Sequence, residues 1–414
     1  MASQPQIHVF NKGDYSSHRL VTLPPTKLEP LSPSSLRLRT KILGLTTNNL
    51  TYANMGFALG WWDTYPIPSS ASSPFNDRDT YATVAGWGYA EVVESSYPGV
   101  EKGASVFGYV HVGSGTWDVS VSDAESGLEG QVLVTSPHRA HLWTIYNRLQ
   151  ILPPLAQLEK ERGRETLGWD ALMQVLFGTG YNLSTYGFAW SDALRIHPSG
   201  EGAWNVEEAR LDGAVCVVLN GGGKTGMGFA YAARHNRPKE QQPTTIIGVG
   251  SEKSKPLLEK CGFYDDVLLS GDAAKVAQLV KQTAPRKVVL LDFGARPGVF
   301  AAYTEALEDA GAPLARFFVG GDNRPAKPQD LMKARGERGE GVQVNANTLR
   351  EKGIEVGRQK YFEDFDRAWE GFVHQGAIKG TKLVWGEGME GWESGWEAFC
   401  NDKVGGNEGL VYTL

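Results

Sequence analysis

The chain has 414 residues, of which 41% are hydrophobic and 21% charged, and its formal net charge is −6. This composition is typical of a soluble globular protein, and the length favours roughly two or three domains. The mildly acidic balance, without a basic cluster interleaved with aromatic residues, argues against nucleic acid or an anionic membrane as a partner.

The three cysteines, Cys216, Cys261 and Cys400, lie far apart in the sequence. This spacing excludes a dense disulfide framework and a zinc site built from four cysteines. The N-terminus has no apolar signal region, and no stretch approaches the length of a membrane span. We therefore expect a soluble, cytoplasmic protein.

The first part of the chain is expected to be rich in β-structure. Residues 35–43 alternate apolar and polar side chains, which predicts a half-buried strand. Residues 83–94 predict a strand, a glycine turn and a second strand, and residues 104–110 predict another strand. Residues 113–130 are polar and rich in glycine, so we expect a long loop or a flexible hairpin there.

The pattern changes near residue 137. Residues 138–147 have helical spacing, and the charged residues 159–165 predict an exposed connection. Residues 169–190 predict one or two helices, broken around residues 178–180. The polar residues 196–210, with their prolines and glycines, are expected to form a linker or surface loop.

After residue 211, strands and helices alternate. The continuous apolar run at residues 214–219 is typical of a parallel strand covered on both faces. The alternation predicts right-handed βαβ units and a parallel sheet. The expected order is helix 227–235, strand 244–249, helix 254–261, strand 266–269, helix 273–283, strand 287–292, helix 299–310 and strand 315–320.

The last part of the chain has a mixed pattern. Residues 364–372 predict an amphipathic helix, and residues 383–385 predict a short strand. A tail rich in tryptophan and glycine is expected at residues 386–409, followed by a last strand at residues 410–414.

A glycine-rich loop, Asn220-Gly-Gly-Gly-Lys-Thr-Gly-Met-Gly228, follows the first strand of the alternating region. Gly221, Gly223 and Gly226 fit the pattern G-x-G-x-x-G, in a strand–loop–helix context. Such a loop makes a tight turn and aims a helix N-terminus at a pyrophosphate. We therefore expect a dinucleotide site, and two alternatives are a nucleotide site no longer used and a ligand-free tight turn. The cofactor-binding residues expected from this loop are Gly223, Lys224, Thr225, Gly226, Met227 and Gly228.

The same loop contains Gly223-Lys-Thr225 and is followed by the apolar run 288–292, a combination that resembles the two nucleotide motifs of a P-loop ATPase. A P-loop needs a glycine five residues before Gly223. That position is Val218, within the predicted strand. The loop is therefore too short for the ATPase interpretation.

The end of the second strand of a Rossmann sheet distinguishes NAD from NADP, because NAD enzymes place a carboxylate there to bind the ribose 2′-hydroxyl. Here that position holds Ser251, with lysines close behind, which favours a 2′-phosphate and hence NADP(H). Glu252 favours NAD, and a solvated helix start remains the alternative without a ligand. The later residues expected to contact the cofactor are Ser251, Lys253, Lys255, Asp292 and Gly320.

Five motifs together carry a family resemblance: residues 47–53, 60–63, 138–139, 146–147 and 224–225. They make the chain similar to the medium-chain dehydrogenase/reductase superfamily, in its zinc-independent, quinone-reductase-like branch. The motifs resemble most specifically the uncharacterised family DUF2855. The three consecutive glycines of the loop depart from the small polar residues that this resemblance implies.

The resemblance implies an α/β fold, with a Rossmann parallel sheet and a β-rich GroES-like domain formed by the N-terminal part and a C-terminal return. The implied parts are residues 1–168, 169–323 and 324–414, with a cleft between the two domains. It also implies a possible homodimer. Zinc-dependent relatives have a cysteine where this chain has Asn48, so we expect no metal.

The resemblance further implies reduction of an activated C=C or C=O bond in a hydrophobic small molecule, with hydride from NADPH. Tyr52 is the candidate proton donor, Asn49 a catalytic polar anchor, and Asn48 a contact to the cofactor. The alternative is that the asparagines hydrogen-bond a turn and Tyr52 packs in a core. A non-redox isomerase, lyase or cyclase on the same fold also remains open. The residues expected to contact substrate are Trp62, Trp87, His138 and Arg139, the last two with a structural alternative.

Overall fold

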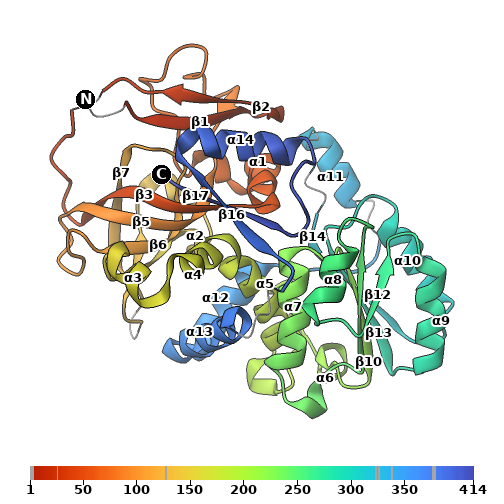
Figure 1. The fold of residues 1–414 in the computed structure, drawn as a ribbon. Helices are drawn as coiled ribbons and strands as arrows, with labels where there is room; N and C mark the ends of the chain where they lie inside the picture. The colour runs from red at the N-terminus through yellow and green to blue at the C-terminus, as the bar shows by residue number, and fades with distance from the viewer. Residues whose placement is uncertain are drawn as a thin grey trace.

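The computed structural model describes residues 4–25, 27–125, 128–321, 324, 327–336, 339–374 and 379–414. Figure 1 shows a β-rich part, which contains both labelled termini, beside an α/β part. The predicted α/β fold class is confirmed. Most strands belong either to a six-stranded parallel sheet or to an eight-stranded sheet in the β-rich part. The three-part division of the chain stays a prediction.

The β-rich part is built around a closed ring of strands. The strand order is β3, β5, β6, β9, β8 and β7, and β7 pairs back with β3. Gly88 lets β5 pass close to β3, because a Cβ atom there would lie 1.9 Å from the carbonyl oxygen of Ile42. The strands are β3 (Ser35–Leu45), β5 (Ala85–Ser95), β6 (Ser105–His111), β7 (Thr116–Asp123), β8 (Gln131–Val134) and β9 (Arg148–Leu152).

Two expectations in this part need correction. Residues 113–130 do not form only a loop, because they contain strand β7, which pairs with β8 as the hairpin that the sequence left open. The alternation of Trp117, Val119 and Val121 is the signal for this strand. Residues 83–94 contain no glycine turn, since β5 runs through both of its glycines. The glycines there permit close packing of strands instead of a change of direction.

The C-terminal residues return to the β-rich part. Strand β17 (Glu408–Thr413) pairs with β3 and with β16 (Lys382–Glu387). Between them lies helix α14 (Gly388–Cys400), so the expected irregular tail is wrong there. Its buried Met389, Trp392 and Trp396 form one helical stripe. This helix packs against the small sheet of β1 (Gln6–Asn11), β2 (Asp14–Thr22) and β4 (Tyr81–Ala82).

The α/β part contains a six-stranded parallel sheet in the order β12, β11, β10, β13, β14, β15. In sequence order this is the 3-2-1-4-5-6 arrangement of a Rossmann fold. The strands are β10 (Ala214–Leu219), β11 (Thr245–Gly250), β12 (Asp266–Leu269), β13 (Lys287–Phe293), β14 (Leu314–Gly320) and β15 (Val342–Gln343).

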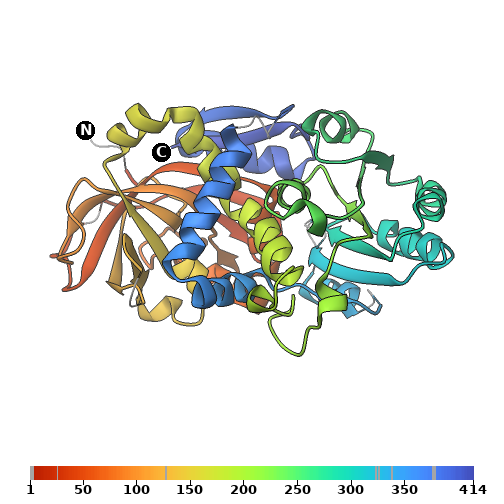
Figure 2. The ribbon, with the colours of Figure 1, turned by 90° about the horizontal axis from the view of Figure 1, so that it is seen from below.

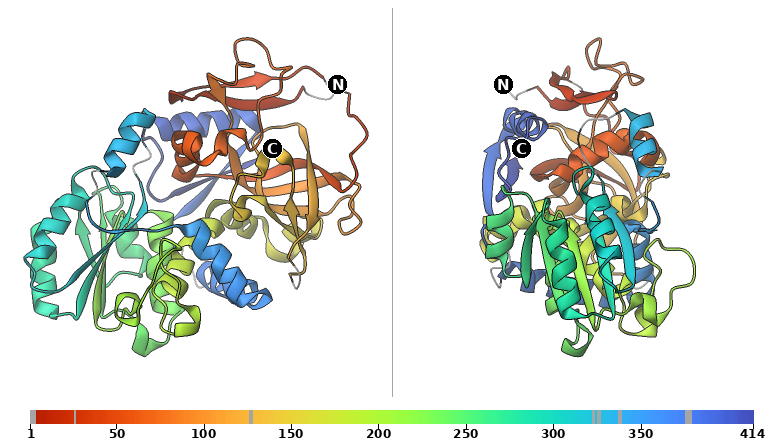
Figure 3. Two further views of the ribbon diagram at one scale, coloured as in Figure 1. Left: turned by 180° about the vertical axis from the view of Figure 1, so that it is seen from behind. Right: turned by 90° about the vertical axis from the view of Figure 1, so that its right-hand side faces the viewer.

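Helices cover both faces of this sheet. Helices α9 (Ala273–Thr283) and α10 (Val299–Glu308) pack on the face that points away from the β-rich part (Figure 3). Helix α13 (Gln359–His374) crosses the middle of the molecule on the other side (Figure 2). The other helices of the α/β part and its flank are α6 (Val206–Ala209), α7 (Lys224–His235), η6 (Lys239–Gln241), α8 (Lys255–Cys261), α11 (Pro328–Gly336) and α12 (Ala346–Gly357).

One nearly continuous helical stretch links the two parts and includes two π-helical segments. It packs against α7 at a glycine crossing: a Cβ atom on Gly180 would lie 2.3 Å from the backbone nitrogen of Phe229. The segments are α3 (Leu155–Arg162), α4 (Arg164–Trp169), η3 (Asp170–Gln174), α5 (Val175–Asn182), η4 (Leu183–Gly187) and η5 (Asp192–Leu194). The remaining helices are α1 (Thr47–Leu59), η1 (Trp61–Asp63), η2 (Pro137–Arg139) and α2 (Thr144–Asn147).

No helix within the described ranges is both long and apolar enough to cross a bilayer.

Candidate functional site

The glycine-rich loop lies at the point where the order of the parallel sheet reverses. Strand β10 pairs with β11 on one side and with β13 on the other. The strands that follow β10 in the chain therefore extend the sheet first on one side of β10 and then on the opposite side. In open α/β sheets, ligands bind outside the carboxyl ends of the strands at such a switch point. Residues 220–223 connect the carboxyl end of β10 to α7 at this position.

Hydrogen bonds from the neighbouring strands hold the loop in place. Asn220 has a left-handed backbone with φ of 55°, and its side-chain amide donates to the Phe293 carbonyl at 3.1 Å. The Gly221 amide donates to the Val249 carbonyl at 2.8 Å, and the Tyr264 hydroxyl donates to the Gly221 carbonyl at 2.7 Å. The loop is therefore tied to the ends of both β11 and β13.

Lys224 is the first residue of α7 and is half-buried. Gly223 occupies the N-cap position of this helix, and no side chain caps the helix N-terminus with a hydrogen bond. Among the described residues, no hydrogen bond or ion pair is recorded for the Lys224 ammonium group. Burial lowers the pKa of Lys224 to about 8. An unpaired ammonium at an uncapped helix N-terminus is suited to bind an anion.

The other predicted loop residues have different surroundings. Thr225 is half-buried beside Lys224, whereas Gly226, Met227 and Gly228 are buried in helix packing. A Cβ atom on Gly228 would lie 3.0 Å from the Cα of Phe177 in α5. The glycines at the start of α7 therefore allow both the turn and the close contact with α5.

The turn after β11 carries the predicted 2′-phosphate residues. The Ser251 amide donates to the Ser254 hydroxyl at 2.9 Å. Lys253 donates to the Val404 carbonyl at 2.9 Å, and its ammonium lies 3.9 Å from the Asp402 carboxylate. Lys255 lies 3.8 Å from Glu259 on the same helix. Both lysines thus have partners, and Lys253 ties the C-terminal return to this turn.

Asp292 and Gly320 lie at the carboxyl ends of β13 and β14. The Asp292 carboxylate accepts hydrogen bonds from the backbone amides of Gly294 and Ala295, at 2.9 and 2.7 Å. Gly320 allows close contact with the β13 end, because a Cβ atom there would lie 2.8 Å from the carbonyl carbon of Phe293. Both predicted cofactor residues therefore shape the same edge of the sheet that holds the glycine loop.

Helix α1 places the predicted catalytic residues. The Asn49 side chain accepts a hydrogen bond from the Thr46 amide at 2.9 Å and donates to the Ala85 carbonyl at 3.4 Å, so its amide caps α1. Asn48 donates to the Tyr52 hydroxyl at 2.6 Å, as expected for side chains one helical turn apart. Asn49 thus has the turn-bonding role that the sequence left open, while Asn48 and Tyr52 form a pair.

Tyr52 is the centre of a group of aromatic residues inside the β-rich part. The group, here named the aromatic cluster, consists of Tyr52, Trp61, Trp87, Tyr109 and Tyr146, with neighbouring ring centroids 4.7 to 6.0 Å apart. The Trp87 indole donates to the Tyr52 hydroxyl at 2.8 Å. Burial raises the pKa of Tyr52 to about 12, despite these hydrogen bonds, which lower it.

The predicted substrate residues are only partly brought together. Trp87 belongs to the aromatic cluster, whereas Trp62 is half-buried and donates to the Ala53 carbonyl at 2.8 Å. His138 is exposed. Arg139 is fully buried, and its guanidinium donates to the Asn147 side chain and the Tyr65 hydroxyl, each at 3.0 Å, and to the Tyr146 carbonyl.

Sequence analysis did not select Tyr109 or Tyr146 as site residues. Tyr109 is opposite Trp87 in the register of β5 and β6, and Tyr146 reaches the cluster from α2. Trp87 and Tyr109 lie on strands in which every second side chain faces the core. This pattern marks a core face but does not show that the two residues share a site. The meeting of α1, α2, β5 and β6 at one point depends on the tertiary fold.

The aromatic cluster lies next to the carboxyl edge of the parallel sheet. Asn54 of α1 donates to the carbonyl of Arg324, which follows β14, at 2.7 Å. The Thr144 amide of α2 donates to the Glu351 carboxylate of α12, which follows β15, at 2.8 Å. The helices that carry Tyr52 and Tyr146 thus contact residues that follow the ends of sheet strands, and Figure 1 shows α1 beside α11.

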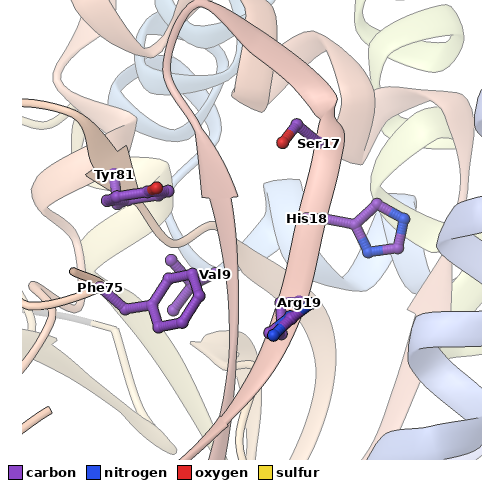
Figure 4. Close-up of a pocket in the computed structure, with 6 residues that line it drawn as sticks. All are labelled: Val9, Ser17, His18, Arg19, Phe75 and Tyr81. Atoms are coloured by element: carbon purple, nitrogen blue, oxygen red, sulfur yellow. The ribbon is translucent and has the colours of Figure 1, made fainter. Parts of the chain in front are cut away.

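Two surface cavities lie apart from these residues. One of about 270 Å³ is lined by Ser17, Arg19, Phe75 and Tyr81 among others, and His18 points to the opposite side of β2 from Ser17 (Figure 4). The second, of about 500 Å³, is lined by residues that include Arg195, His197 and Lys352. Neither cavity is lined by a predicted site residue. In the described part of the chain, no three His, Cys, Asp or Glu side chains gather as a metal-binding group.

Solved structures with the same fold cover nearly the whole chain at low sequence identity. A mutant enoyl thioester reductase from Candida tropicalis matches with a TM-score of 0.58 and 12% identity over 100% of both chains. CurA from Vibrio vulnificus in complex with NADPH matches with a TM-score of 0.56 and 13% identity, over 99% of this chain and 98% of that chain. The CurF cyclopropanase of the curacin A pathway matches with a TM-score of 0.55 and 13% identity over 99% of both chains.

These matches establish that the chain shares the fold of these solved structures. A comparison with curated proteins found no match. A family model described as "Protein of unknown function (DUF2855)" matches residues 43–405, which is most of the chain. The predicted family is therefore confirmed, and the protein belongs to the DUF2855 family.

Proposed function

We propose that this protein is an NADPH-dependent oxidoreductase that reduces an activated C=C bond in a small hydrophobic molecule, with an enoyl thioester as the substrate class to test first. The observation that carries the proposal is the Lys224 ammonium group at the uncapped N-terminus of α7, without a recorded partner among the described residues. It lies in the glycine loop at the switch point of the sheet, where a pyrophosphate would meet both the helix dipole and a positive charge.

The residues around this loop fit a dinucleotide. Ser251 follows the end of β11, at the position where NAD enzymes have a carboxylate. Lys253 and Lys255 come shortly after it in the chain. This favours NADP(H) over NAD(H), because a 2′-phosphate needs positive charge where a 2′-hydroxyl needs an acceptor. When bound, the reduced nicotinamide would supply the hydride for the reaction.

The aromatic cluster supplies the apolar surroundings and the proton source. Asn48 and Trp87 both direct N–H groups at the Tyr52 oxygen, at 2.6 and 2.8 Å. These hydrogen bonds stabilise the phenolate that remains once a proton has been transferred. No acid or base beyond this cluster is needed for the proposal, which also keeps the reaction independent of zinc.

The test is a titration of the purified protein with NADPH and NADH, followed by nicotinamide fluorescence. We expect NADPH to bind more tightly than NADH, and Lys224→Met to weaken NADPH binding by roughly 10- to 100-fold through loss of a charge-assisted hydrogen bond. Lys281→Met is the matched control, because Lys281 is an exposed lysine of α9 outside the glycine loop and the turn after β11. Equal binding by wild type and Lys224→Met, or no binding by either, would contradict the proposal.

A non-redox reaction on the same fold is the second candidate, and it is favoured by the fold match to a cyclopropanase. The two candidates differ in the fate of bound NADPH. A reductase consumes it when crotonyl-CoA, a simple enoyl thioester, is added, and the absorbance of the reduced nicotinamide falls. Bound NADPH that persists with crotonyl-CoA, quinones and aldehydes alike would favour the non-redox candidate.

A further inference from the structure

We infer that the Asp402 carboxylate occupies the cations that bind the 2′-phosphate of NADPH, so that the cofactor must displace it. This role rests on the proposed function and adds two residues that set the preference for NADPH. Arg296 is a second cation for the phosphate, and Asp402 is the competitor of the phosphate. Both assignments follow from the contacts of residues 401–407, here named the strap, with the turn after β11.

The strap begins and ends in the β-rich part and contacts the α/β part in between. It connects the end of α14 to the start of β17. A Cβ atom on Gly406 would lie 3.8 Å from the Lys253 carbonyl oxygen and 3.8 Å from the Ser254 Cα. The strap therefore packs on the turn after β11, which carries the residues proposed to bind the 2′-phosphate.

The strap holds the side chain of Lys253. The ammonium group donates to the Val404 carbonyl at 2.9 Å and to the Asp402 carbonyl at 3.3 Å. It also lies 3.9 Å from the Asp402 carboxylate. Every acceptor recorded for this ammonium group within the described ranges belongs to the strap, so a bound phosphate competes with the strap for Lys253.

Arg296 brings a second cation to the same carboxylate from another strand end. It lies in the loop after β13, and its guanidinium is 3.6 Å from the Asp402 carboxylate. Asp402 therefore bridges one cation that follows β11 and one that follows β13, the two strands on either side of β10. A dinucleotide at this switch point places its ribose 2′-position at the end of β11. A 2′-phosphate that replaces the carboxylate would contact both cations.

The charges favour exchange of the carboxylate for a phosphate. Two cations share the Asp402 carboxylate, so the group keeps a net positive charge. A phosphate monoester carries a charge of about −1.5 to −2 at pH 7 and three strong acceptor oxygens, more than a carboxylate offers. A ribose 2′-hydroxyl carries no charge and leaves Asp402 in place. The competition therefore affects NADPH and not NADH.

The contacts of the carboxylate are weak enough for a ligand to displace. The exposed fractions of the side chains are 79% for Asp402, 50% for Lys253 and 76% for Arg296. Exposed ion pairs contribute little free energy, and salt screens them. Because the apparent Kd rises as the binding-competent fraction falls, such a competitor should raise the Kd for NADPH by only about three- to tenfold.

The first experiment measures binding of NADPH and NADH, which differ only in the 2′-phosphate, to Asp402→Asn. We expect the Kd for NADPH to fall about three- to tenfold at low ionic strength and the Kd for NADH to stay unchanged. High salt should reduce the gain for NADPH. Asparagine keeps the strap backbone, because it tolerates the left-handed conformation of residue 402, whose φ is 52°. An unchanged Kd for NADPH would show that the carboxylate does not compete.

Asp309→Asn is the matched control for this titration, because it removes the same charge from an exposed residue at the end of α10. Helix α10 leads from the carboxyl end of β13 back to the start of the parallel strand β14, so Asp309 lies at the opposite edge of the sheet. Its removal should leave the Kd for NADPH in place. If Asp309→Asn and Asp402→Asn tighten NADPH equally, the effect is one of net charge and the competition is rejected.

Arg296→Met tests the second cation. It should weaken NADPH binding by about tenfold through loss of a charge-assisted contact to the phosphate, and leave NADH binding unchanged. In this background Asp402→Asn should tighten NADPH less than it does in the wild type, because one of the two cations that hold the carboxylate is gone. Equal gains in the two backgrounds would contradict the bridge between the cations.

The second experiment follows hydrogen exchange of the strap backbone, without substrate or turnover. In the strap, the Lys403 amide donates to the Ala398 carbonyl at 2.8 Å and the Gly405 amide to the Glu408 carboxylate at 2.9 Å, so both should exchange slowly. We expect NADPH to speed exchange at residues 401–407, because Lys253 leaves the strap carbonyls for the phosphate. NADH should have no such effect. Unchanged or slower exchange with NADPH would mean that the strap is not displaced.

The two experiments separate the role of Asp402 from the proposed function. If NADPH fails to bind, or binds no better than NADH, the proposed cofactor preference falls and the role of Asp402 falls with it. If NADPH binds more tightly than NADH, but neither Asp402→Asn nor the exchange of the strap shows displacement, the proposed function stands and the competition alone is rejected.

Discussion

Two ionisable side chains, Asp170 in η3 just before α5 and Lys224 at the start of α7, differ in their partners. Asp170 is 0% exposed and accepts hydrogen bonds from the Tyr89 hydroxyl at 2.6 Å and the Trp369 indole at 2.7 Å. Its carboxylate also forms an ion pair with the Arg162 guanidinium at 2.9 Å. For Lys224, by contrast, no such partner is recorded anywhere in the described part of the chain.

The difference indicates two kinds of role for a buried charge. Burial is the largest cause of the raised pKa of Asp170, and its hydrogen bonds and the charge of Arg162 oppose that cause. Burial alone lowers the pKa of Lys224. A charge with all its partners in the fold holds helices together, whereas a charge left without them costs stability unless a ligand supplies the counter-charge.

The largest expected effect is on stability at Asp170. Asp170→Ala should lower the free energy of unfolding by roughly 3–5 kcal/mol, because it leaves a partly buried guanidinium and two donors without an acceptor. Denaturant unfolding measures this. Asp364→Ala, which breaks an exposed pair with Lys360, should cost less than about 1 kcal/mol. If the two variants lower the free energy of unfolding equally, the buried hydrogen bonds of Asp170 do not stabilise the fold more than an exposed ion pair does.

A smaller loss is expected where the two regions are joined. Gly180→Ala places a Cβ atom 2.3 Å from the backbone nitrogen of Phe229, so α5 and α7 must move apart. Such overpacking costs about 1–3 kcal/mol. Gly271→Ala, which meets nothing within 4 Å, is the control, and both are measured by thermal unfolding. If Gly180→Ala is as stable as wild type, the crossing does not couple the regions.

The preference for NADPH over NADH tests the cofactor site proposed around Lys224 and the turn after β11. Ser251→Asp places a carboxylate at the end of β11, where it repels a 2′-phosphate and accepts from a 2′-hydroxyl. We expect the ratio of NADPH to NADH affinity to fall by about tenfold, which is roughly 1.4 kcal/mol. Glu252→Gln should not lower that ratio. A preference that is unchanged in Ser251→Asp would place the adenosine ribose away from this turn.

The smallest effect is the pH dependence of the ligand-free protein. The folded pKa of Lys224 is about 8, below its ordinary 10.5, so the folded state binds fewer protons than the unfolded state between these values. Its contribution to stability is therefore greatest above the ordinary pKa and is lost as the pH falls through about 8. Lys224→Met should raise Tm at pH 7 by about 1–3 °C, opposite in sign to Asp170→Ala. A lower Tm would mean that Lys224 has a structural partner.

Much of the α/β part could be predicted from the sequence. The apolar run that became β10, the glycine loop and the alternation of strands and helices gave the parallel sheet, because local patterns report burial on both faces of such strands. Helix α14 was missed because its glycines resemble a loop in sequence, although Met389, Trp392 and Trp396 have helical spacing. Strand β7 was missed because its polar side chains outnumber its apolar ones.

The candidate site divides in the same way. Lys224 and its loop are contiguous, so their spacing alone places them on one turn. Asn48 and Tyr52 are one helical turn apart, and the sequence could pair them for that reason. Trp87 comes from β5 and Tyr146 from α2, and only the folded chain brings the Trp87 indole to the Tyr52 oxygen and the Tyr146 ring beside the Tyr52 ring.

The sequence by itself determined the Rossmann segment, the position of the glycine loop and the family, because each depends on residues that are neighbours along the chain. The tertiary structure decided which ionisable groups have partners, that Asn49 caps a helix, and that three phenols share one cluster. The physical reason is that hydrogen-bond partners and burial depend on contacts between distant segments, which local periodicity does not encode.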